Sequence, residues 1–186
     1  MRLWLVRHAA PRLEPGRCYG RLDVEADEAA TQAAAAALRA ALPPRWAGWH
    51  STRSRCRQLA TALGEPPAGA WREDARLDEL DFGAWEGRAW EAIGAAALDA
   101  WVADFAHHRP GGGESVAGML ARVRAALGEA AAAGADDLVW ITHAGVIRAV
   151  QWLRAHGERL PRADVWPQRA PAWGQWVALE LTSPSM

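Results

Sequence analysis

Two histidines and two arginines stand at positions where the sequence predicts the ends of strands. Arg7 and His8 stand at the end of the apolar run RLWLVR, and His143 follows the apolar run DLVWIT. Arg55 lies in the opening turn of a helix that follows a third short segment, WAGWHS. Because open parallel sheets bind ligands just beyond the carboxyl ends of their strands, we expect these four side chains to share one pocket.

These residue types suit the transfer of a phosphoryl group. An arginine keeps its charge and offers planar, bidentate donors to phosphate oxygens, and a nearby helix N-terminus adds backbone donors. A neutral imidazole held among such charges can attack phosphorus, which splits one difficult displacement into two easier ones. The pattern therefore predicts a phosphohistidine intermediate on one of the two histidines.

The elements that must position these residues alternate between strands and helices. We expect strands at residues 2–7, 46–51, 69–74, 137–142 and 173–181. We expect helices after caps at Asp27, at Ser51 or Thr52, and at Ser115, and two more helices at 89–106 and 146–155. This alternation predicts one α/β domain over residues 1–186, with three α/β/α layers and a mostly parallel central sheet.

Five segments resemble, in order, the motifs of the histidine phosphatase superfamily, which includes cofactor-dependent phosphoglycerate mutases and alpha-ribazole phosphatases. LWLVRHAAP is similar to its Arg-His-Gly signature, and STRSRCRQLA to its Ser-Pro-Leu-x-Arg-Ala-x-Gln-Thr-Ala segment. LDELDFGAWEG is similar to Leu-x-Glu-x-x-x-Gly-x-Trp-Glu-Gly, PGGGES to Pro-Gly-Gly-Glu-Ser, and ITHAGVIR to Ser/Thr-His-x-Gly-x-Ile/Val-Arg. The resemblance covers most of the chain and implies a phosphoglycerate mutase-like fold.

The resemblance also implies a role for each candidate residue and adds a fifth. Arg7, Arg55 and His143 would hold the phosphoryl oxygens while His8 attacks. Glu79 would protonate the leaving alcohol and later take a proton from the water that hydrolyses the phosphohistidine. No metal or other cofactor is implied, because the arginines neutralise the charge that Mg²⁺ neutralises in many other phosphoryl-transfer sites.

Two features of the sequence leave parts of this assignment open. Glu79 shares its loop with three other carboxylates, and only the motif spacing distinguishes it from them; they are Asp78, Asp81 and Glu86. Residues 10–13 also lack the Asn that many members of the family place after the first strand. Arg12 and Arg21 are the candidates to replace that phosphate contact, and Tyr19 is a third candidate for contact with the substrate.

The composition argues against several other classes of partner. The chain has 21 Lys and Arg against 22 Asp and Glu, a formal net charge of −1, and no basic block that would neutralise a polynucleotide backbone. Charged residues interrupt the first apolar run too early for a membrane span, and Cys18 and Cys56 have neither disulfide nor zinc-site spacing. We therefore expect a cytoplasmic protein that binds neither nucleic acid nor membrane and is a monomer or a homodimer.

The length of one segment bears on the reaction. Only 24 residues, Arg88 to Gly111, separate the Trp-Glu-Gly motif from the Gly-Gly-Glu-Ser stretch, where the family's mutases carry a longer, water-excluding insertion. A shorter segment over the site admits water, and water can then accept the phosphoryl group. We therefore predict hydrolysis of a small-molecule phosphomonoester. PGRCYGRLDV resembles the early loop of alpha-ribazole phosphatases, which makes alpha-ribazole 5'-phosphate, of cobalamin biosynthesis, the leading substrate.

Three alternatives stand beside this prediction. The first is a small-molecule phosphatase of broad specificity, and the second is a mutase of the phosphoglycerate type. The third belongs to another class, a module that binds a phosphorylated ligand without turning it over. A pure binder has no need of a protonating carboxylate, so the carboxylate of Glu79 disfavours the third.

Overall fold

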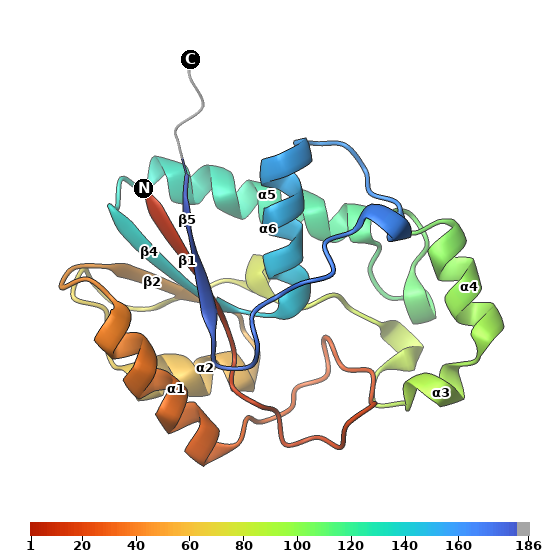
Figure 1. Cartoon of the computed structure of the whole chain (residues 1–186), viewed down its shortest axis with the longest axis horizontal. Coiled ribbons are helices and arrows are strands. Elements are labelled where there is room, and N and C mark those ends of the chain that lie inside the picture. Colours follow the sequence, from red (N-terminus) through yellow and green to blue (C-terminus); the bar gives the residue numbers. More distant parts are fainter. Residues whose placement is uncertain (182–186) are drawn as a thin grey trace.

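A central sheet is covered by helices on both faces in the computed structural model, which describes residues 1–181 (Figure 1). The strands are β1 (Arg2–Arg7), β2 (Ala47–His50), β3 (Arg72–Glu73), β4 (Asp137–Thr142) and β5 (Trp176–Glu180). They pair in the order β3-β2-β4-β1-β5, and every neighbouring pair is parallel except β1 with β5. The predicted α/β fold with a mostly parallel sheet is confirmed.

The α-helices fall into three groups by position. In chain order they are α1 (Glu28–Ala41), α2 (Ser54–Leu63), α3 (Trp90–Ile93), α4 (Ala95–Ala103), α5 (Val116–Ala132) and α6 (Ala144–His156). α1 and α2 lie on one face of the sheet and α5 and α6 on the other, whereas α3 and α4 lie beyond its edge, at the right of Figure 1. The predicted three layers are therefore present.

The strands carry apolar side chains toward both helical layers. In β1, Leu3 and Leu5 belong to the core under α5 and α6, whereas Trp4 and Val6 belong to the core under α1 and α2. Successive side chains of a strand point to opposite faces, so a strand covered on both faces must be apolar throughout. This is why β1 and β4 read as continuous apolar runs that end abruptly in polar residues.

Two predicted elements differ from the observed ones near α3 and α6. Residues 89–106 do not form one helix, because Gly94 has φ 90° between α3 and α4, in a region that few side chains tolerate. α6 begins at Ala144, two residues earlier than predicted. His143 is consequently the N-cap residue of α6, and the first turn of this helix adjoins the end of β4.

The start of α2 also differs from the prediction. Neither Ser51 nor Thr52 caps this helix, because both hydroxyls donate to the carboxylate of Asp78, at 2.6 and 2.7 Å. Asp23 instead accepts hydrogen bonds from the backbone N–H and the hydroxyl of Ser54, both at 2.7 Å. A carboxylate from the loop after β1 thus accepts the hydrogen bond of a free N–H group at the start of α2. We expected a side chain next to the helix in sequence to do so. By contrast, the predicted caps of α1 and α5 are confirmed.

A long connection joins α6 to β5. Residues 157–175, drawn in blue, run down beside β5 in Figure 1 and then turn into this strand, which pairs with β1. We call this segment the strap. Among residues 1–181, none of the helices combines the length and the apolarity that a membrane crossing requires.

Candidate active site

Three of the predicted site residues meet beyond the carboxyl ends of β1 and β4. The imidazole rings of His8 and His143 have their centroids 5.2 Å apart, and Nε of Arg55 donates to Nδ1 of His143 at 3.3 Å. All three are buried, with exposed fractions of 2% or less. Because β1 and β4 pair in parallel with Arg7 opposite Thr142, the residues that follow these two strands lie side by side.

The ring of His8 is held in one tautomer. Its Nδ1 lies 2.7 Å from the backbone oxygen of Ala9. A carbonyl oxygen can only accept, so Nδ1 carries the hydrogen and Nε2 keeps a free lone pair. Burial, and then the charges of Arg55 and Arg7, lower the pKa of His8 to about 3. The imidazole is therefore neutral near pH 7 and carries an unprotonated nitrogen, as a nucleophile requires.

His143 is held by hydrogen bonds on both ring nitrogens. Because Nε of Arg55 is a donor, Nδ1 of His143 must accept, which leaves the hydrogen on Nε2. Nε2 lies 2.8 Å from Oγ of Ser51, and this hydroxyl in turn donates to Asp78 at 2.6 Å. Burial, followed by the charge of Arg55, lowers the pKa of His143 well below its ordinary value. Ser51 and Asp78 are site residues that our sequence reasoning missed, although Ser51 heads the STRSRCRQLA motif.

Arg55 connects this centre to the loop after β1. Its Nη1 donates to the backbone oxygen of Leu22 at 2.9 Å, and its Nη2 donates to that of Gly20 at 2.6 Å. The guanidinium carbon also lies 5.3 Å from the centroid of the Tyr19 ring. A fully buried cation on α2 therefore fixes a loop that has little regular secondary structure, and holds it across the site.

Arg7 has a donor without a partner among the described residues. Its Nη1 donates to the backbone oxygen of Pro171 in the strap at 3.1 Å, and its guanidinium carbon lies 5.3 Å from the Trp173 ring centroid. Its Nε is buried and makes no hydrogen bond within residues 1–181. A buried N–H without a partner is unfavourable, so this donor is available to a bound acceptor.

Glu79 reaches the same site from the other side. Its two carboxylate oxygens accept from the backbone N–H groups of Leu80 and Gly145, each at 3.0 Å. Gly145 lies in the first turn of α6, two residues after His143. A Cβ atom built on Gly145 would lie 2.0 Å from Oε1 of Glu79, so only glycine leaves room for the carboxylate there. The carboxylate therefore lies at the N-terminus of α6, against the helix turn that follows His143.

The other three carboxylates of the loop are engaged in structural hydrogen bonds. Asp78 accepts from the side chains of Ser51 and Thr52 and from Arg53. Asp81 pairs with the backbone N–H of Gly83 and with Arg21. Glu86 binds four backbone N–H groups at 2.9–3.1 Å, those of Gly20, Arg21, Leu22 and Phe82. Among the four carboxylates, only Glu79 has a hydrogen bond to α6 within residues 1–181.

The three predicted substrate contacts lie in different surroundings. The Tyr19 ring centroid is 6.4 Å from that of His8, so Tyr19 borders the site. Arg21 is largely exposed and pairs with Asp81 at 3.1 Å, and Arg12 is exposed. Within residues 1–181, neither of these guanidinium groups bonds to His8 or to the residues around it. Their contact with a substrate stays a prediction.

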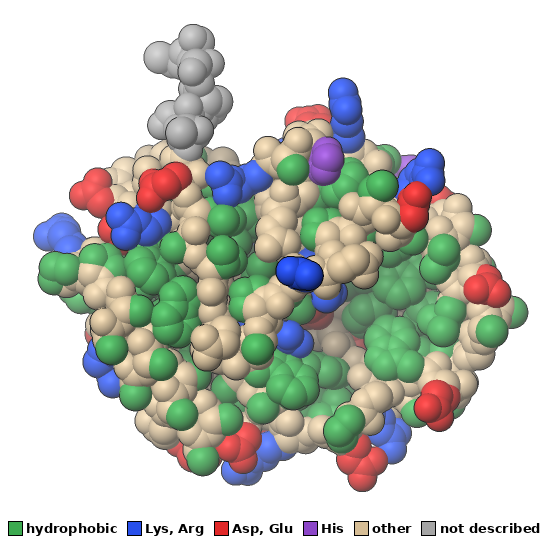
Figure 2. Space-filling view, viewed as in Figure 1, with side chains coloured by type: hydrophobic (Ala, Val, Ile, Leu, Met, Phe, Trp, Pro, Cys, Tyr) green, Lys and Arg blue, Asp and Glu red, His purple; other side chains and the backbone are tan. Residues whose placement is uncertain are grey.

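Figure 2 shows the surface hollowed between the strap and the helices α3 and α4, with apolar side chains around much of the hollow. Among residues 1–181, no group of three or more His, Cys, Asp and Glu side chains is arranged to hold a metal ion.

Comparisons with known proteins give a consistent result. The family model described as "Histidine phosphatase superfamily (branch 1)" matches residues 3–174. The chain is 35% identical over 179 residues to glucosyl-3-phosphoglycerate phosphatase of Mycobacterium tuberculosis, a match that covers 89% of this chain and 78% of that protein. Among solved structures, TTHB049 from Thermus thermophilus has a TM-score of 0.70 and 33% identity, over 97% of this chain and 94% of the other. The native mycobacterial glucosyl-3-phosphoglycerate phosphatase has a TM-score of 0.70 and 31% identity, over 81% and 77%.

Proposed function

Because the chain belongs to the histidine phosphatase superfamily and is a phosphoric monoester hydrolase, we propose that it works in two steps through a phosphohistidine at His8. The observation that carries this proposal is the state of the His8 ring. It is buried and neutral, its Nδ1–H is bound to the backbone oxygen of Ala9, and its Nε2 lone pair has no hydrogen-bond partner among the described residues. Neither step requires a metal.

In the first step, the Nε2 lone pair of His8 forms a bond to phosphorus as the bond from phosphorus to the leaving oxygen breaks. The leaving oxygen takes a proton from the carboxyl group of Glu79, and the organic part of the substrate departs as an alcohol. The hydrogen bond from Gly145 to Glu79 supports this role, because it holds the carboxyl at the N-terminus of α6, the helix that His143 caps.

In the second step, a water molecule attacks the phosphorus of the phosphohistidine. The carboxylate of Glu79 takes one proton from that water, and the N–P bond breaks so that its electron pair returns to Nε2. Phosphate leaves, and both His8 and Glu79 regain their starting states. The enzyme is then ready for another substrate molecule.

The charge of the transferring group would be held by Arg7, Arg55 and His143. The unpartnered Nε–H of Arg7 supports its part, since a phosphoryl oxygen would satisfy that donor. In its neutral form, both ring nitrogens of His143 already have partners. A phosphate dianion beside the ring favours the protonated form of His143. We therefore propose that substrate binding raises the pKa of His143 and that Nδ1, once protonated, donates to a phosphoryl oxygen in place of accepting from Arg55.

For the substrate, we propose a small phosphomonoester with a sizeable organic part. The relatives named as glucosyl-3-phosphoglycerate phosphatases favour a phosphorylated, sugar-bearing acid of that kind. Alpha-ribazole 5'-phosphate is the second candidate and depends on the segment PGRCYGRLDV alone. A phosphatase of broad specificity is compatible with either.

The experiment is phosphate release from a panel of monoesters that includes both candidates, with a chelator present throughout. We expect activity with the chelator, and a labelled phosphoenzyme that is stable to base and labile to acid. Full activity in His8→Ala, or activity that disappears with the chelator, would overturn the mechanism. The rank of kcat/KM across the panel decides the substrate.

A further inference from the structure

The loop that carries Glu79 has no helix or strand of its own at that residue. Glu79 lies in the segment 78–82, between the 3₁₀ turn Ala75–Leu77 and the 3₁₀ turn Gly83–Trp85, and this segment belongs to neither turn. Backbone carbonyls in such a segment must find partners elsewhere. The position of the Glu79 carboxyl therefore depends on whatever binds these carbonyls.

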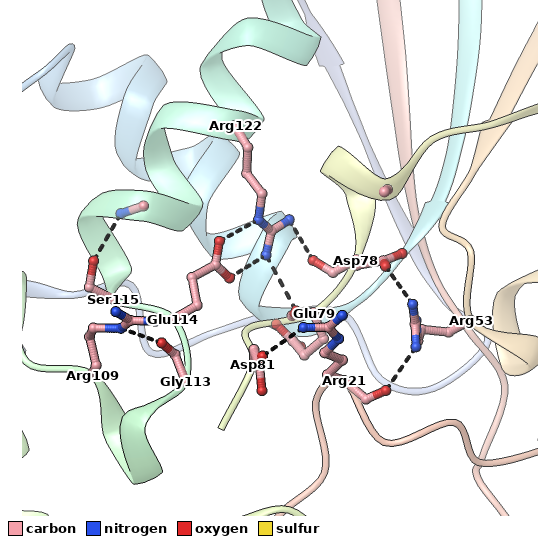
Figure 3. A pocket seen from close by; sticks show the side chains of 12 residues that line it. Arg21, Arg53, Asp78, Glu79, Asp81, Arg109, Gly113, Glu114, Ser115 and Arg122 are labelled. Carbon is pink, nitrogen blue, oxygen red and sulfur yellow. Dashed lines mark hydrogen bonds and ion pairs between the residues drawn. The ribbon is translucent and has the colours of Figure 1, made fainter. Parts of the chain in front are cut away.

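One side chain of α5 binds three carbonyls in and next to this segment. Nη1 of Arg122 donates to the backbone oxygens of Arg76 and Asp78, at 2.8 and 2.7 Å, and Nη2 donates to that of Glu79 at 3.3 Å. Figure 3 shows the Arg122 guanidinium between α5 and this loop. The three contacts therefore hold the backbone that leads up to Glu79 and the backbone of Glu79 itself.

The remaining donors of Arg122 are bound by Glu114. Nε and Nη2 of Arg122 donate to the two carboxylate oxygens of Glu114, at 2.7 and 2.8 Å (Figure 3). A guanidinium has five N–H donors, and here each has one acceptor. The pair is mostly buried, with side-chain exposures of 19% for Arg122 and 24% for Glu114. Glu114 thus neutralises the charge of Arg122 and fixes the orientation of its guanidinium group.

The same loop is anchored at two further points. The backbone N–H of Glu114 donates to the oxygen of Asp81 at 2.8 Å, and a Cβ atom on Gly113 would lie 2.0 Å from that oxygen. The hydroxyl of Thr142, directly before His143, donates to the oxygen of Leu77 at 2.6 Å. The loop is therefore clamped between the start of α5 and the end of β4.

We propose that Arg122, oriented by Glu114, is a positioning residue for proton transfer by Glu79. It does not touch the substrate; it holds the backbone of Glu79 where the carboxyl reaches the leaving oxygen. The inference rests on the proposed function, in which Glu79 protonates that oxygen. Misplacement of a catalytic group by about 1 Å can cost about 100-fold in rate, so loss of three carbonyl contacts should affect this step.

The test uses two substrates that differ in their need for a proton. An alkyl phosphate must be protonated as it leaves, whereas the 4-nitrophenolate of 4-nitrophenyl phosphate departs without a proton. We expect Arg122→Gln to lower kcat/KM for the alkyl phosphate by about 100-fold, and for 4-nitrophenyl phosphate by only a few-fold. Arg122→Lys should show the same pattern, because a single ammonium cannot reproduce the planar fork. Glu79→Gln should show it more strongly.

Arg124→Gln is the matched control, since Arg124 lies on the same helix and pairs with Glu158 at the surface. It should leave both substrates unchanged. If Arg122 acts through Glu79, Arg122→Gln combined with Glu79→Gln should lose no more than Glu79→Gln alone. Equal losses for the two substrates, or additive losses in the double variant, would overturn the proposal, as would no loss in a folded Arg122→Gln.

Two further measurements separate this proposal from its premise. Thermal unfolding of each variant shows whether a uniform loss comes from instability, and Glu114→Gln offers a milder variant that keeps Arg122. If Glu79→Gln itself shows no dependence on the leaving group, or His8→Ala is fully active, then the proposed function has failed. If these two behave as expected and Arg122→Gln does not, only the positioning role has failed.

Discussion

The two halves of the candidate site are held in place by different means. His8 and His143 follow neighbouring parallel strands, so the hydrogen bonds of the sheet and the apolar packing on both of its faces fix where they lie. Glu79 lies in a loop, and the backbone of this loop is fixed by separate hydrogen bonds from side chains of α5 and β4 to its carbonyl oxygens.

This difference has consequences for how each half responds to change. The histidine half shares its positions with the core, so a substitution that moves it must also disturb the sheet. The Glu79 half depends on a small number of polar contacts, most of them made by a single arginine. We therefore expect substitutions at the histidines to lower activity by removing a reacting group. Substitutions around Glu79 should lower activity by moving its carboxyl group.

The largest effect is expected from His8→Ala. Removal of the attacking nitrogen should lower kcat by at least about 10⁴-fold, and no phosphoenzyme should form, because the remaining charges cannot replace a nucleophile. Phosphate release and labelling quenched in base measure the two quantities. His107→Ala is the control, since His107 is exposed in the segment after α4. Residual labelling in His8→Ala would mean that another residue takes the phosphate, and would contradict the role given to the histidine half of the site.

The second effect compares two arginines on α2. Arg55→Lys should lower kcat/KM by about 100- to 1000-fold, because one charge-stabilising donor is lost and the bonds to Gly20 and Leu22 break. Arg57→Lys, at an exposed position two residues later, should change kcat/KM little. Hydrogen exchange of the loop at 19–22 should rise in the first variant alone. Equal kinetic losses in both variants would count against a special role for Arg55.

A smaller effect is expected where the two halves touch. In Gly145→Ala the added Cβ would lie 2.0 Å from Oε1 of Glu79, so the carboxyl must shift while the histidines stay in place. We expect a loss of about 10- to 100-fold for alkyl phosphates and a smaller loss for 4-nitrophenyl phosphate. Gly128→Ala on α5 is the control, because its Cβ meets nothing within 4 Å. Loss with both substrates alike would mean that the histidine half had moved as well.

The last prediction concerns stability and pH, not rate. The pKa of His8 is about 3 when folded and has an ordinary value of 6.5, so between these values the unfolded chain binds a proton that the folded chain does not. Acidification through this range therefore destabilises the protein. In His8→Gln the slope of unfolding free energy against pH should fall by up to about 1.4 kcal/mol per pH unit in this range, and should be unchanged above it. Denaturant titrations at several pH values would measure this, and identical slopes would contradict the burial of a neutral His8.

Sequence reasoning succeeded where a residue's position follows from its own segment. The ends of β1 and β4 are marked by apolar runs that stop at charged or polar residues, which is why His8, His143 and Arg7 could be named. Glu79 could be named only through a family resemblance. Nothing local separates it from its neighbour Asp78, whose carboxylate binds Ser51 and Thr52 instead of α6.

The positioning residues could not be named from the sequence. Arg122 binds backbone oxygens that lie 43 to 46 residues away along the chain, and Glu86 binds backbone N–H groups that lie 64 to 66 residues away. Such distant partners leave no trace in residue type or local spacing. The cap that Asp23 supplies to α2 from 31 residues away was missed for the same reason.

The sequence by itself determined the alternation of strands and helices, the family motifs and the four charged or imidazole side chains at strand ends, because periodicity and strand polarity are local properties. The tertiary structure alone decided which carboxylate binds the N-terminus of α6, which tautomer each histidine adopts, and how an irregular loop is kept in place. These depend on hydrogen-bond partners and burial, and folding brings such partners together from distant parts of the chain.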